Sequence, residues 1–424
     1  MSFAKLRPMT LSNPTATPDW TCPFCSLLCE NFHPAPGGAA PIDGSDCPRA
    51  LAALAAHTRP GPGPGALIDG QPASIDAALD EAARRLAGWR QPLFGGLGTD
   101  ITGARALYRL AARTQAICDH ADGATLMQGV RAVQDRGQYI ATIAEVRVRA
   151  ELIVCVGTPA VARYPEFFRR IGLGEAGSPC RELVFVGVAP PEGLPAGVAV
   201  RTLAGSGDLA EDVRQLAARV DRQRLPAPDG GLAALAQRLL DSPYAVLVWE
   251  AAPLGPEAAL VIEALNRIVG TLNRKTRAAT FGLGGSDGAF SVNQTFTWLS
   301  GLPLRTRVSA AGLQHEPRCF DTARLLADGS VDGLLWISSF SVDRLPPPAA
   351  VPRIVLGPPG MRAALQGAGE GVFLPVATPG LNAGGHLFRT DGPVVLQVVP
   401  LRDDGLPGVA DVLARLGERL GATP

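Results

Sequence analysis

Residues 151–159 read ELIVCVGTP, a run of apolar residues that ends in a Gly–Thr–Pro turn. A strand that is apolar at every position must be buried on both faces, because successive side chains point to opposite sides of a sheet. Similar runs recur along the chain, and most of them end in Gly, Pro or Ser: residues 91–99, 182–188, 244–252, 333–340 and 353–360. We therefore expect parallel sheets whose two faces are both covered.

Segments with apolar residues at helical spacing separate several of these runs. The clearest is 73–89 (ASIDAALDEAARRLAGW), in which a serine stands where it can cap the first turn. Residues 102–116, 208–223, 255–272 and 408–421 are expected to be helices as well. Residues 386–400 instead predict a hairpin, since Asp391-Gly392 is a turn signal between two strand-like runs. The alternation of strands and helices indicates an α/β fold.

The chain is long enough for more than one domain, because 424 residues exceed the roughly 150 typical of a single domain. We divide it into a Cys-rich lobe (1–58), a first α/β region (66–242) and a second α/β region with a C-terminal hairpin and helix (243–424). The stretch RPGPGPG at 59–65 reads as a stiff linker, because alternating Pro and Gly continue neither a helix nor a sheet.

The charge balance excludes some classes of protein. Lys plus Arg and Asp plus Glu both number 39, so no net charge favours nucleic acid or membrane surfaces. No apolar run reaches the roughly 18 residues of a membrane span, and the N-terminus lacks the apolar stretch of a signal peptide. We expect a cytoplasmic protein, in which cysteines stay reduced rather than forming disulfides.

Half of the eight cysteines lie in one short part of the chain. Cys22, Cys25 and Cys29 in TCPFCSLLCEN, followed by Cys47, give the spacing C-x2-C-x3-C-x17-C. Thiolates are soft ligands for iron–sulfur clusters and zinc. A four-iron cluster, zinc and free thiols all stay open as interpretations, although zinc ribbons favour two C-x2-C pairs and only one is present. Isolated cysteines such as Cys118 and Cys155 are expected to be buried apolar side chains.

The cysteine block and three later blocks, at 143–170, 293–312 and 378–394, resemble the B subunit of formylmethanofuran dehydrogenase in residue type and in order. That protein is a member of the molybdopterin oxidoreductase family, and the resemblance spans nearly the whole chain. It implies several parallel-sheet α/β domains of molybdopterin-oxidoreductase type with a small N-terminal Cys-rich lobe. It also implies a 4Fe-4S cluster, or zinc, at Cys22, Cys25, Cys29 and Cys47.

One stretch departs from that family. In the dehydrogenase, a cysteine or selenocysteine beside a histidine binds molybdenum or tungsten, and the matching stretch here is ATLMQGV (124–130). Met127 takes the ligand position, and a thioether is a weak ligand for a high-valent oxo-metal. Gln128 replaces the histidine, which removes a group for proton transfer. The substitutions predict a lost metallopterin site and no molybdopterin.

The same combination is typical of the B subunit of the bacterial formyltransferase/hydrolase complex, which has lost the metallopterin. The resemblance implies a non-catalytic, structural and carrier-binding subunit that works with A, C and D subunits. Such complexes pass a formyl group from tetrahydromethanopterin to a methanofuran-like carrier and release formate, as part of formaldehyde oxidation. The alternatives are a catalytic molybdenum or tungsten dehydrogenase subunit that uses another ligand, and an electron-transfer protein.

Other residues are weaker candidates for a site. Polyglutamate tails of the carrier would suit guanidinium groups, which bind carboxylates in a bidentate manner, although solvated surface charge is the plain alternative. The candidates are Arg274, Lys275, Arg277, Arg305 and Arg307, and a further candidate group is the pair Arg169 and Arg170. His33 and His120 could bind a metal or ligand, and two glycine-rich turns could hold a nucleotide: Gly95, Gly96 and Gly98, and Gly282, Gly284 and Gly285.

Overall fold

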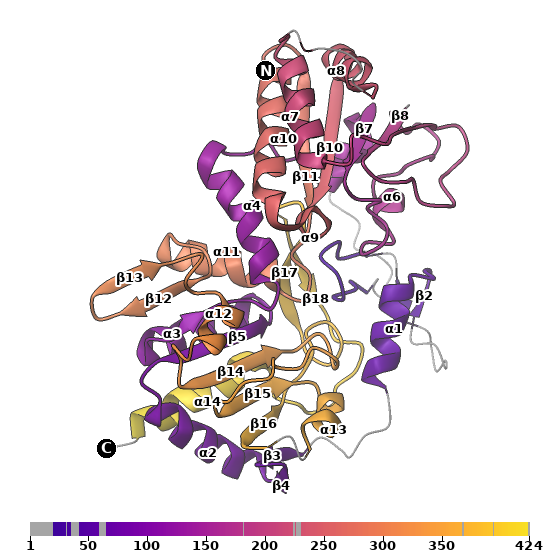
Figure 1. Cartoon of the computed structure of the whole chain (residues 1–424). Helices are drawn as coiled ribbons and strands as arrows, with labels where there is room; N and C mark the ends of the chain where they lie inside the picture. Colours follow the sequence, from indigo (N-terminus) through magenta and orange to yellow (C-terminus); the bar gives the residue numbers. More distant parts are fainter. Residues whose placement is uncertain are drawn as a thin grey trace, which may run out of the picture.

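The computed structural model of the chain describes residues 20–30, 32–34, 42–58, 65–180, 182–223, 225, 230–366, 369–392 and 394–422. Most of the linker predicted at 59–65 lies outside these residues, as do the first 19 residues of the predicted Cys-rich lobe. Two sheets form the body of the molecule, one above the other in Figure 1. None of the helices in the described ranges combines the length and apolar character that a membrane span requires.

The upper half is built on a five-stranded parallel sheet with the order β11-β10-β7-β8-β9. Its strands are β7 (Leu152–Val156), β8 (Glu182–Val186), β9 (Ala199–Leu203), β10 (Tyr244–Glu250) and β11 (Arg277–Leu283). One face packs against α4 (Gly123–Arg136), α7 (Leu209–Val220), α8 (Leu232–Asp241) and α10 (Ala258–Leu272). The connections also contain α5 (Ile143–Arg149), α6 (Phe167–Arg170), α9 (Ala251–Leu254) and η1 (Gly255–Glu257).

The lower half is built on a nine-stranded sheet with the order β13-β12-β6-β5-β14-β15-β16-β3-β4. Its core strands run parallel: β6 (Ile117–Cys118), β5 (Pro92–Gly98), β14 (Gly333–Ser338), β15 (Arg353–Gly357) and β16 (Gly371–Pro375). Antiparallel strands extend both edges: β12 (Thr306–Ser309), β13 (Gly312–His315), β3 (Ala66–Ile68) and β4 (Gln71–Ala73).

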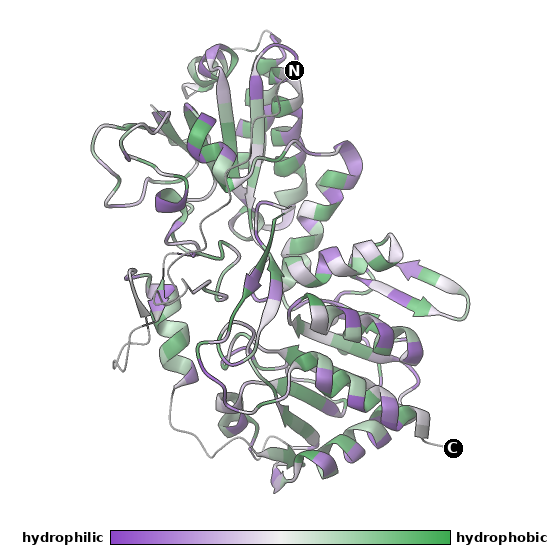
Figure 2. Ribbon diagram, turned by 180° about the vertical axis from the view of Figure 1, so that it is seen from behind, coloured by the Kyte–Doolittle hydropathy of each residue, from purple (hydrophilic) through white to green (hydrophobic). Residues whose placement is uncertain are grey.

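Helices cover both faces of the nine-stranded sheet. One face packs against α2 (Ile75–Gly88), α3 (Ile101–Thr114), α11 (Ala289–Ser300) and α14 (Val409–Ala422). The other face lies against α12 (Thr322–Ala327), η2 (Pro359–Met361) and α13 (Arg362–Leu365). Figure 2 shows strands that are largely apolar and helices with one polar side, which is the pattern expected for buried parallel sheets.

Two smaller parts, the N-terminal lobe and the C-terminal hairpin, lie between the halves. The lobe contains β1 (His33–Pro34), β2 (Ile42–Asp43) and α1 (Pro48–His57), and its cysteine loop packs on the free face of the five-stranded sheet. The C-terminal hairpin of β17 (Gly385–Phe388) and β18 (Val395–Val398) extends from the lower half toward the upper half (Figure 1). The cysteine loop therefore covers this face together with residues of α5 and α6.

The α/β class and the individual strands and helices predicted from the sequence are confirmed. Ser74 caps α2 as expected, since its hydroxyl accepts a hydrogen bond of 3.1 Å from the Ala77 N–H. The sheets do not follow the boundary proposed at residue 243, however. That position falls between β9 and β10, which belong to the same sheet, and the nine-stranded sheet takes strands from both ends of the chain. Strand order is set by long-range pairing, which the local pattern does not encode.

Candidate functional site

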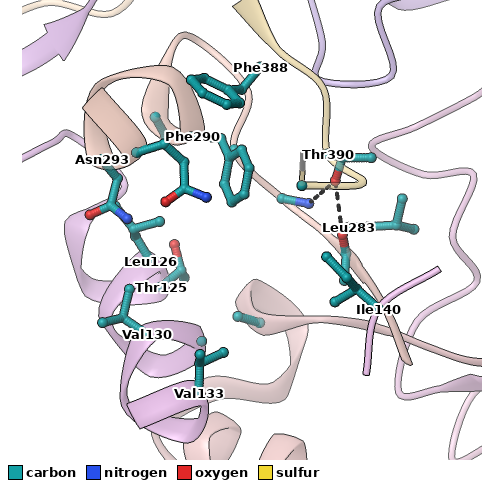
Figure 3. Close-up of a pocket in the computed structure, with 18 of the residues that line it drawn as sticks. Thr125, Leu126, Val130, Val133, Ile140, Leu283, Phe290, Asn293, Phe388 and Thr390 are labelled. Atoms are coloured by element: carbon teal, nitrogen blue, oxygen red, sulfur yellow. Dashed lines mark hydrogen bonds between the residues drawn. The ribbon is translucent and has the colours of Figure 1, made fainter. Parts of the chain in front are cut away.

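A pocket of about 740 Å³ lies at the carboxyl ends of β10 and β11, where the two halves meet. In open α/β sheets this is the end at which ligands bind. Helix α4 forms one wall, α11 another, and the end of the hairpin strand β17 closes the pocket (Figure 3). The pocket is thus made by segments from the middle and the end of the chain.

The pocket wall is mainly apolar. Leu126, Val130 and Val133 come from one face of α4, because residues three and four apart share a helix face. They lie across the pocket from Ile140 and Leu283, while Phe290 and Phe388 form another part of the wall (Figure 3). Polar side chains such as Thr125, Asn293 and Thr390 are interspersed. This mixture is typical of small-molecule sites.

Thr390 joins the hairpin to the end of β11. Its hydroxyl donates to the Gly282 carbonyl at 2.8 Å and accepts from the Gly284 N–H at 3.3 Å (Figure 3). Gly282, Gly284 and Gly285 therefore line the pocket. The other predicted glycine turn does not, because Gly95, Gly96 and Gly98 lie inside β5. A Cβ on Gly96 would be 2.6 Å from the Ile337 carbonyl oxygen, so close backbone packing explains that glycine.

The carboxylates that line the pocket each have a cationic partner. Asp122 pairs with Arg344 at 3.0 Å and Asp391 with Arg389 at 2.7 Å. Glu250 pairs with Arg163 at 3.2 Å. Burial raises the pKa of the Glu250 carboxyl, and the Arg163 guanidinium opposes that shift. Arg163 is the basic side chain among the described lining residues, so the wall presents no unpaired positive charge.

Met127 and Gln128 do not line this pocket. Met127 is buried in the core of the lower half, and the Gln128 Oε1 atom accepts a hydrogen bond of 3.2 Å from the Ala259 N–H of α10. The pocket wall takes its neighbours Leu126 and Gly129 instead. Among the described residues that form the wall, none is a cysteine or a histidine. The wall therefore lacks the thiolate and imidazole donors that a metal site in this pocket would use.

The cysteine loop is a compact, buried structure. Cys22, Cys25, Cys29 and Cys47 are all buried, and the Cys22 N–H donates to the Cys29 carbonyl at 2.9 Å. Aromatic side chains enclose the loop, and the ring of Trp20 contacts those of Phe24 and Phe32. Leu28, the residue before Cys29, has a φ of 45°, which turns the backbone sharply.

The four thiols influence one another. Burial raises the pKa of Cys22, and the negative charge that Cys25, Cys29 or Cys47 would carry raises it further. Burial likewise raises the pKa of Cys25, and that of Cys29 to about 12. As placed, neither these cysteines nor any other set of Cys, His, Asp or Glu in the described ranges forms a group that could hold a metal ion. This also applies to His33, which is exposed.

The cysteine loop contacts the pocket wall on the side that faces away from the cavity. The Ser26 hydroxyl donates to the Gly284 carbonyl at 2.5 Å, and the Thr390 N–H donates to the Ser26 carbonyl at 2.8 Å. Both Gly284 and Thr390 line the pocket. The loop and the pocket therefore share a wall, although the sequence places them far apart.

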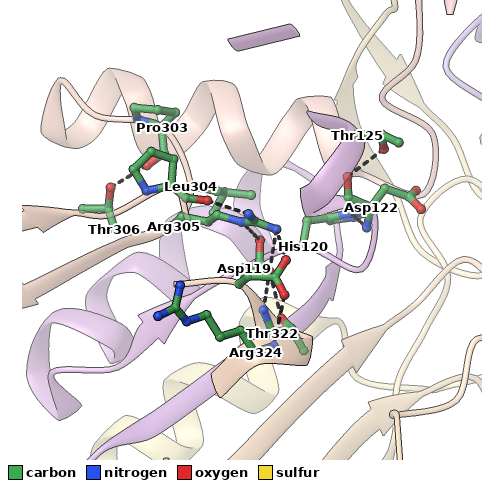
Figure 4. A network of polar contacts seen from close by, with 12 residues as sticks. Asp119, His120, Asp122, Thr125, Pro303, Leu304, Arg305, Thr306, Thr322 and Arg324 are labelled. Carbon is green, nitrogen blue, oxygen red and sulfur yellow. Dashed lines mark hydrogen bonds and ion pairs between the residues drawn. The ribbon is translucent and has the colours of Figure 1, made fainter. Parts of the chain in front are cut away.

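Two of the predicted carrier-binding arginines have partners within the protein. Arg305 is buried, and its Nε lies 3.0 Å from the Asp119 carboxylate (Figure 4). Its Nη2 lies 2.5 Å from the Asp321 carboxylate. Its guanidinium is therefore engaged by carboxylates of the protein itself. Arg307 is half-buried and hydrogen-bonds through its Nε to Gln314 at 2.9 Å. Neither arginine lines the pocket.

The other predicted cations are exposed or paired. Arg274 and Lys275 follow α10, and Arg277 begins β11, at the end of the sheet opposite the pocket. All three are exposed. Of the neighbouring pair, Arg170 lies 3.6 Å from Glu30 and Arg169 binds Glu166.

His120 is held by its own surroundings rather than by a ligand. Its Nδ1 accepts a hydrogen bond of 2.9 Å from the Asp122 N–H, so its Nε2 donates to the Asp287 carbonyl at 3.2 Å. Burial lowers the pKa of His120 and keeps the ring neutral. His120 thus orders the turn that leads into α4. Sequence reasoning did not identify Trp249 and Glu250 as residues of the pocket wall. Both lie at the carboxyl end of an apolar strand, β10, and ligand sites in α/β folds lie at such strand ends.

Replacing Arg305 should test its structural role. Arg305→Met leaves the Asp119 carboxylate buried without its cation, so we expect a loss of about 3 kcal/mol in the free energy of unfolding. The exposed control Arg274→Met should change it by less than about 0.5 kcal/mol. The measurement is urea denaturation of both variants. Unchanged stability in Arg305→Met, with weakened carrier binding, would return Arg305 to the carrier site.

Comparisons with known proteins identify two similar B subunits. No family model matches the chain. The B subunit of the formyltransferase/hydrolase complex Fhc from Methylorubrum extorquens is 28% identical over 364 residues, covering 84% of this chain and 98% of the relative. The B subunit of the tungsten-containing formylmethanofuran dehydrogenase 2 from Methanococcus maripaludis is 21% identical over 435 residues, covering 93% of this chain and 96% of the relative.

A solved structure matches as well. One of the chains in the crystal structure of the Methylorubrum extorquens formyltransferase/hydrolase complex with methylofuran superposes with a TM-score of 0.72 and 28% identity. The match covers 84% of this chain and 99% of that one. By sequence and by fold, the chain is similar to the B subunits of formylmethanofuran dehydrogenase and of the formyltransferase/hydrolase complex.

Proposed function

We propose that the chain is the B subunit of a formyltransferase/hydrolase complex, with A, C and D subunits as its partners. In this role it is a structural and carrier-binding subunit without a metallopterin. The complex would move a formyl group from tetrahydromethanopterin to a methanofuran-type carrier and release formate. The similarity to the Methylorubrum extorquens complex, solved with methylofuran, supports this assignment, and we propose a cytoplasmic site of action.

The proposal that redox chemistry has been lost rests on which residues form the pocket wall. In the dehydrogenase that the chain resembles, the ligand of molybdenum or tungsten is a cysteine or selenocysteine beside a histidine, and the wall residues that are described include neither cysteine nor histidine. Cys118 is not a replacement, because it is buried in the core of the lower half. Met127, the residue at the former ligand position, is buried in the same core. A catalytic dehydrogenase subunit would need a ligand that this pocket does not offer.

The cysteine loop is proposed to hold a 4Fe-4S cluster. The spacing C-x2-C-x3-C-x17-C favours a cluster over zinc, because zinc ribbons use two C-x2-C pairs and only one is present. Without a metallopterin the cluster has no redox partner in this chain, and its role would be to hold the lobe against the five-stranded sheet.

Metal analysis tests the cluster. The full-length chain, purified without oxygen, should contain about four iron atoms. Cys25→Ser and Cys47→Ser should each lose most of that iron, whereas Cys319→Ser, at an exposed cysteine outside the loop, should keep it. Iron would be measured by mass spectrometry alongside the visible absorption band. One zinc per chain, or neither metal, would contradict the cluster assignment.

Reconstitution tests the proposed function. A tagged copy of the chain, expressed with the A, C and D subunits of its own organism, should purify with all three. The complex should release formate from formyl-tetrahydromethanopterin, and omission of this chain should abolish or strongly reduce the rate. Failure to co-purify, or an unchanged rate without the chain, would reject the assignment.

The same assay tests the carrier-binding residues. Arg274, Lys275 and Arg277 are three exposed cations close in sequence, which suits a polyglutamate tail. R274A/K275A/R277A should raise the KM for the polyglutamylated carrier several-fold and leave kcat unchanged, with a smaller effect at high salt. Arg90→Ala, which removes an equally exposed charge elsewhere, is the control. An unchanged KM in the triple variant would remove this group from the proposal.

A further inference from the structure

One edge of the nine-stranded sheet is open among the described strands. Strand β13 pairs with β12 and with no other strand in the described ranges. Figures 1 and 2 both show the β12–β13 hairpin projecting from the body of the lower half. Only Thr306 and Arg307 of β12 pair with β6, so the outer part of the hairpin extends beyond its neighbour in the sheet. A two-stranded hairpin is marginally stable by itself, and a further strand along its edge would stabilise it.

The hydrogen-bond pattern shows which backbone groups of β13 face the open edge. Just beyond the paired strands, the Glu316 N–H donates to the Arg305 carbonyl at 3.0 Å. Hydrogen-bonded pairs alternate with non-hydrogen-bonded pairs along an antiparallel ladder. Gln314 therefore bonds to β12, whereas Leu313 and His315 direct their N–H and C=O groups to the open edge. The edge thus offers two donors and two acceptors.

This edge lacks the features that normally prevent strands from pairing. Proteins protect edge strands with proline or with charged side chains. The strand at the opposite edge of the same sheet, β4, contains Pro72, and the end strand β9 of the five-stranded sheet contains Arg201. Strand β13 reads GLQH and contains neither proline nor Lys, Arg, Asp or Glu. Burial lowers the pKa of His315, so its ring is neutral at pH 7 and the edge is uncharged.

The β13 edge is complementary to itself. Antiparallel pairing about a two-fold axis at Gln314 places Leu313 of each copy opposite His315 of the other. Their outward N–H and C=O groups then form four backbone hydrogen bonds. No like charges face each other, because the strand carries none. The Leu313 side chain is 41% exposed, and the second copy would cover part of it.

We propose that the β13 edge is the interface of a homodimer, in which antiparallel pairing of β13 with β13 joins the two nine-stranded sheets. A second copy fits this edge better than a charged strand, since the edge matches itself in its backbone groups and in its lack of charge. The proposal is independent of the proposed formyl transfer, because it uses neither the pocket nor the cysteine loop. A complex that contains this chain would then hold two copies of it.

The molar mass of the purified full-length chain tests dimer formation. At about 0.1 mM, light scattering after size exclusion should give twice the 44.0 kDa of one chain, and the mass should fall on dilution because so small an interface is weak. L313P removes an outward donor and leaves the bonds between β12 and β13 in place, so it should be monomeric. L313V keeps that donor and should dimerise like the unmodified chain.

An engineered disulfide tests the position of the two-fold axis. Gln314 would face Gln314 of the second copy in a non-hydrogen-bonded pair, whose Cα atoms lie about 4.5 Å apart, within the range of a disulfide. The exposed Cys319 is first replaced by serine. In this background, Q314C should form a covalent dimer with oxidised glutathione. Q71C, at an exposed position of the opposite edge strand β4, is the matched control and should remain monomeric.

Three results would overturn the proposal. They are the mass of a single chain at the highest concentration, unchanged dimerisation in L313P, and no more covalent dimer in Q314C than in Q71C. Thermal unfolding of each variant shows whether it is folded. The disulfide test does not depend on L313P, so it decides the matter even if that variant fails to fold.

Discussion

The hydrogen bonds among Ser26, Gly284 and Thr390 join three segments that are far apart in sequence. Ser26 belongs to the cysteine loop, Gly284 follows the last strand of the five-stranded sheet, and Thr390 follows the hairpin strand β17. Parallel strands leave their carboxyl ends facing loops, so these ends need partners from elsewhere in the chain. Here the partners come from both termini. The packing of the lobe against the five-stranded sheet and the shape of the pocket both depend on this junction.

The local architecture could be predicted from the sequence. Runs such as LIVCV can only be buried strands in a covered sheet, and Ser74 and Asp391-Gly392 mark a helix start and a hairpin turn. The way in which strands share sheets could not be predicted. The lower sheet pairs β5 with β14, which come from opposite ends of the chain, and hydrophobic periodicity carries no information on such long-range pairs.

In the candidate site, too, features that are local in sequence could be predicted, whereas contacts between distant segments could not. The cysteine spacing identified a loop whose four thiols do interact, since it is local in sequence. The side chains that face the pocket are set by the rotation of α4, and the sequence alone did not show that Met127 turns into the core while Leu126 faces the cavity. Arg305 resembled a surface cation because its partners, Asp119 and Asp321, lie elsewhere in the sequence.

The chain has the fold of the B subunits it resembles, and the described wall of its pocket contains neither cysteine nor histidine. The pocket is open at the sheet ends, its wall is largely apolar, and its charges are paired within the protein. The cysteine loop packs against the side of that wall that faces away from the cavity. Under the proposed function, this fold serves as a scaffold in a complex that performs no redox step.

The loss of the metallopterin is best tested by molybdenum and tungsten analysis of the assembled complex, purified without oxygen from cells supplied with both metals. We expect neither metal above trace levels in a complex that is active in formyl transfer. One molybdenum or tungsten atom per copy of this chain would contradict the loss and would identify the chain as a dehydrogenase subunit.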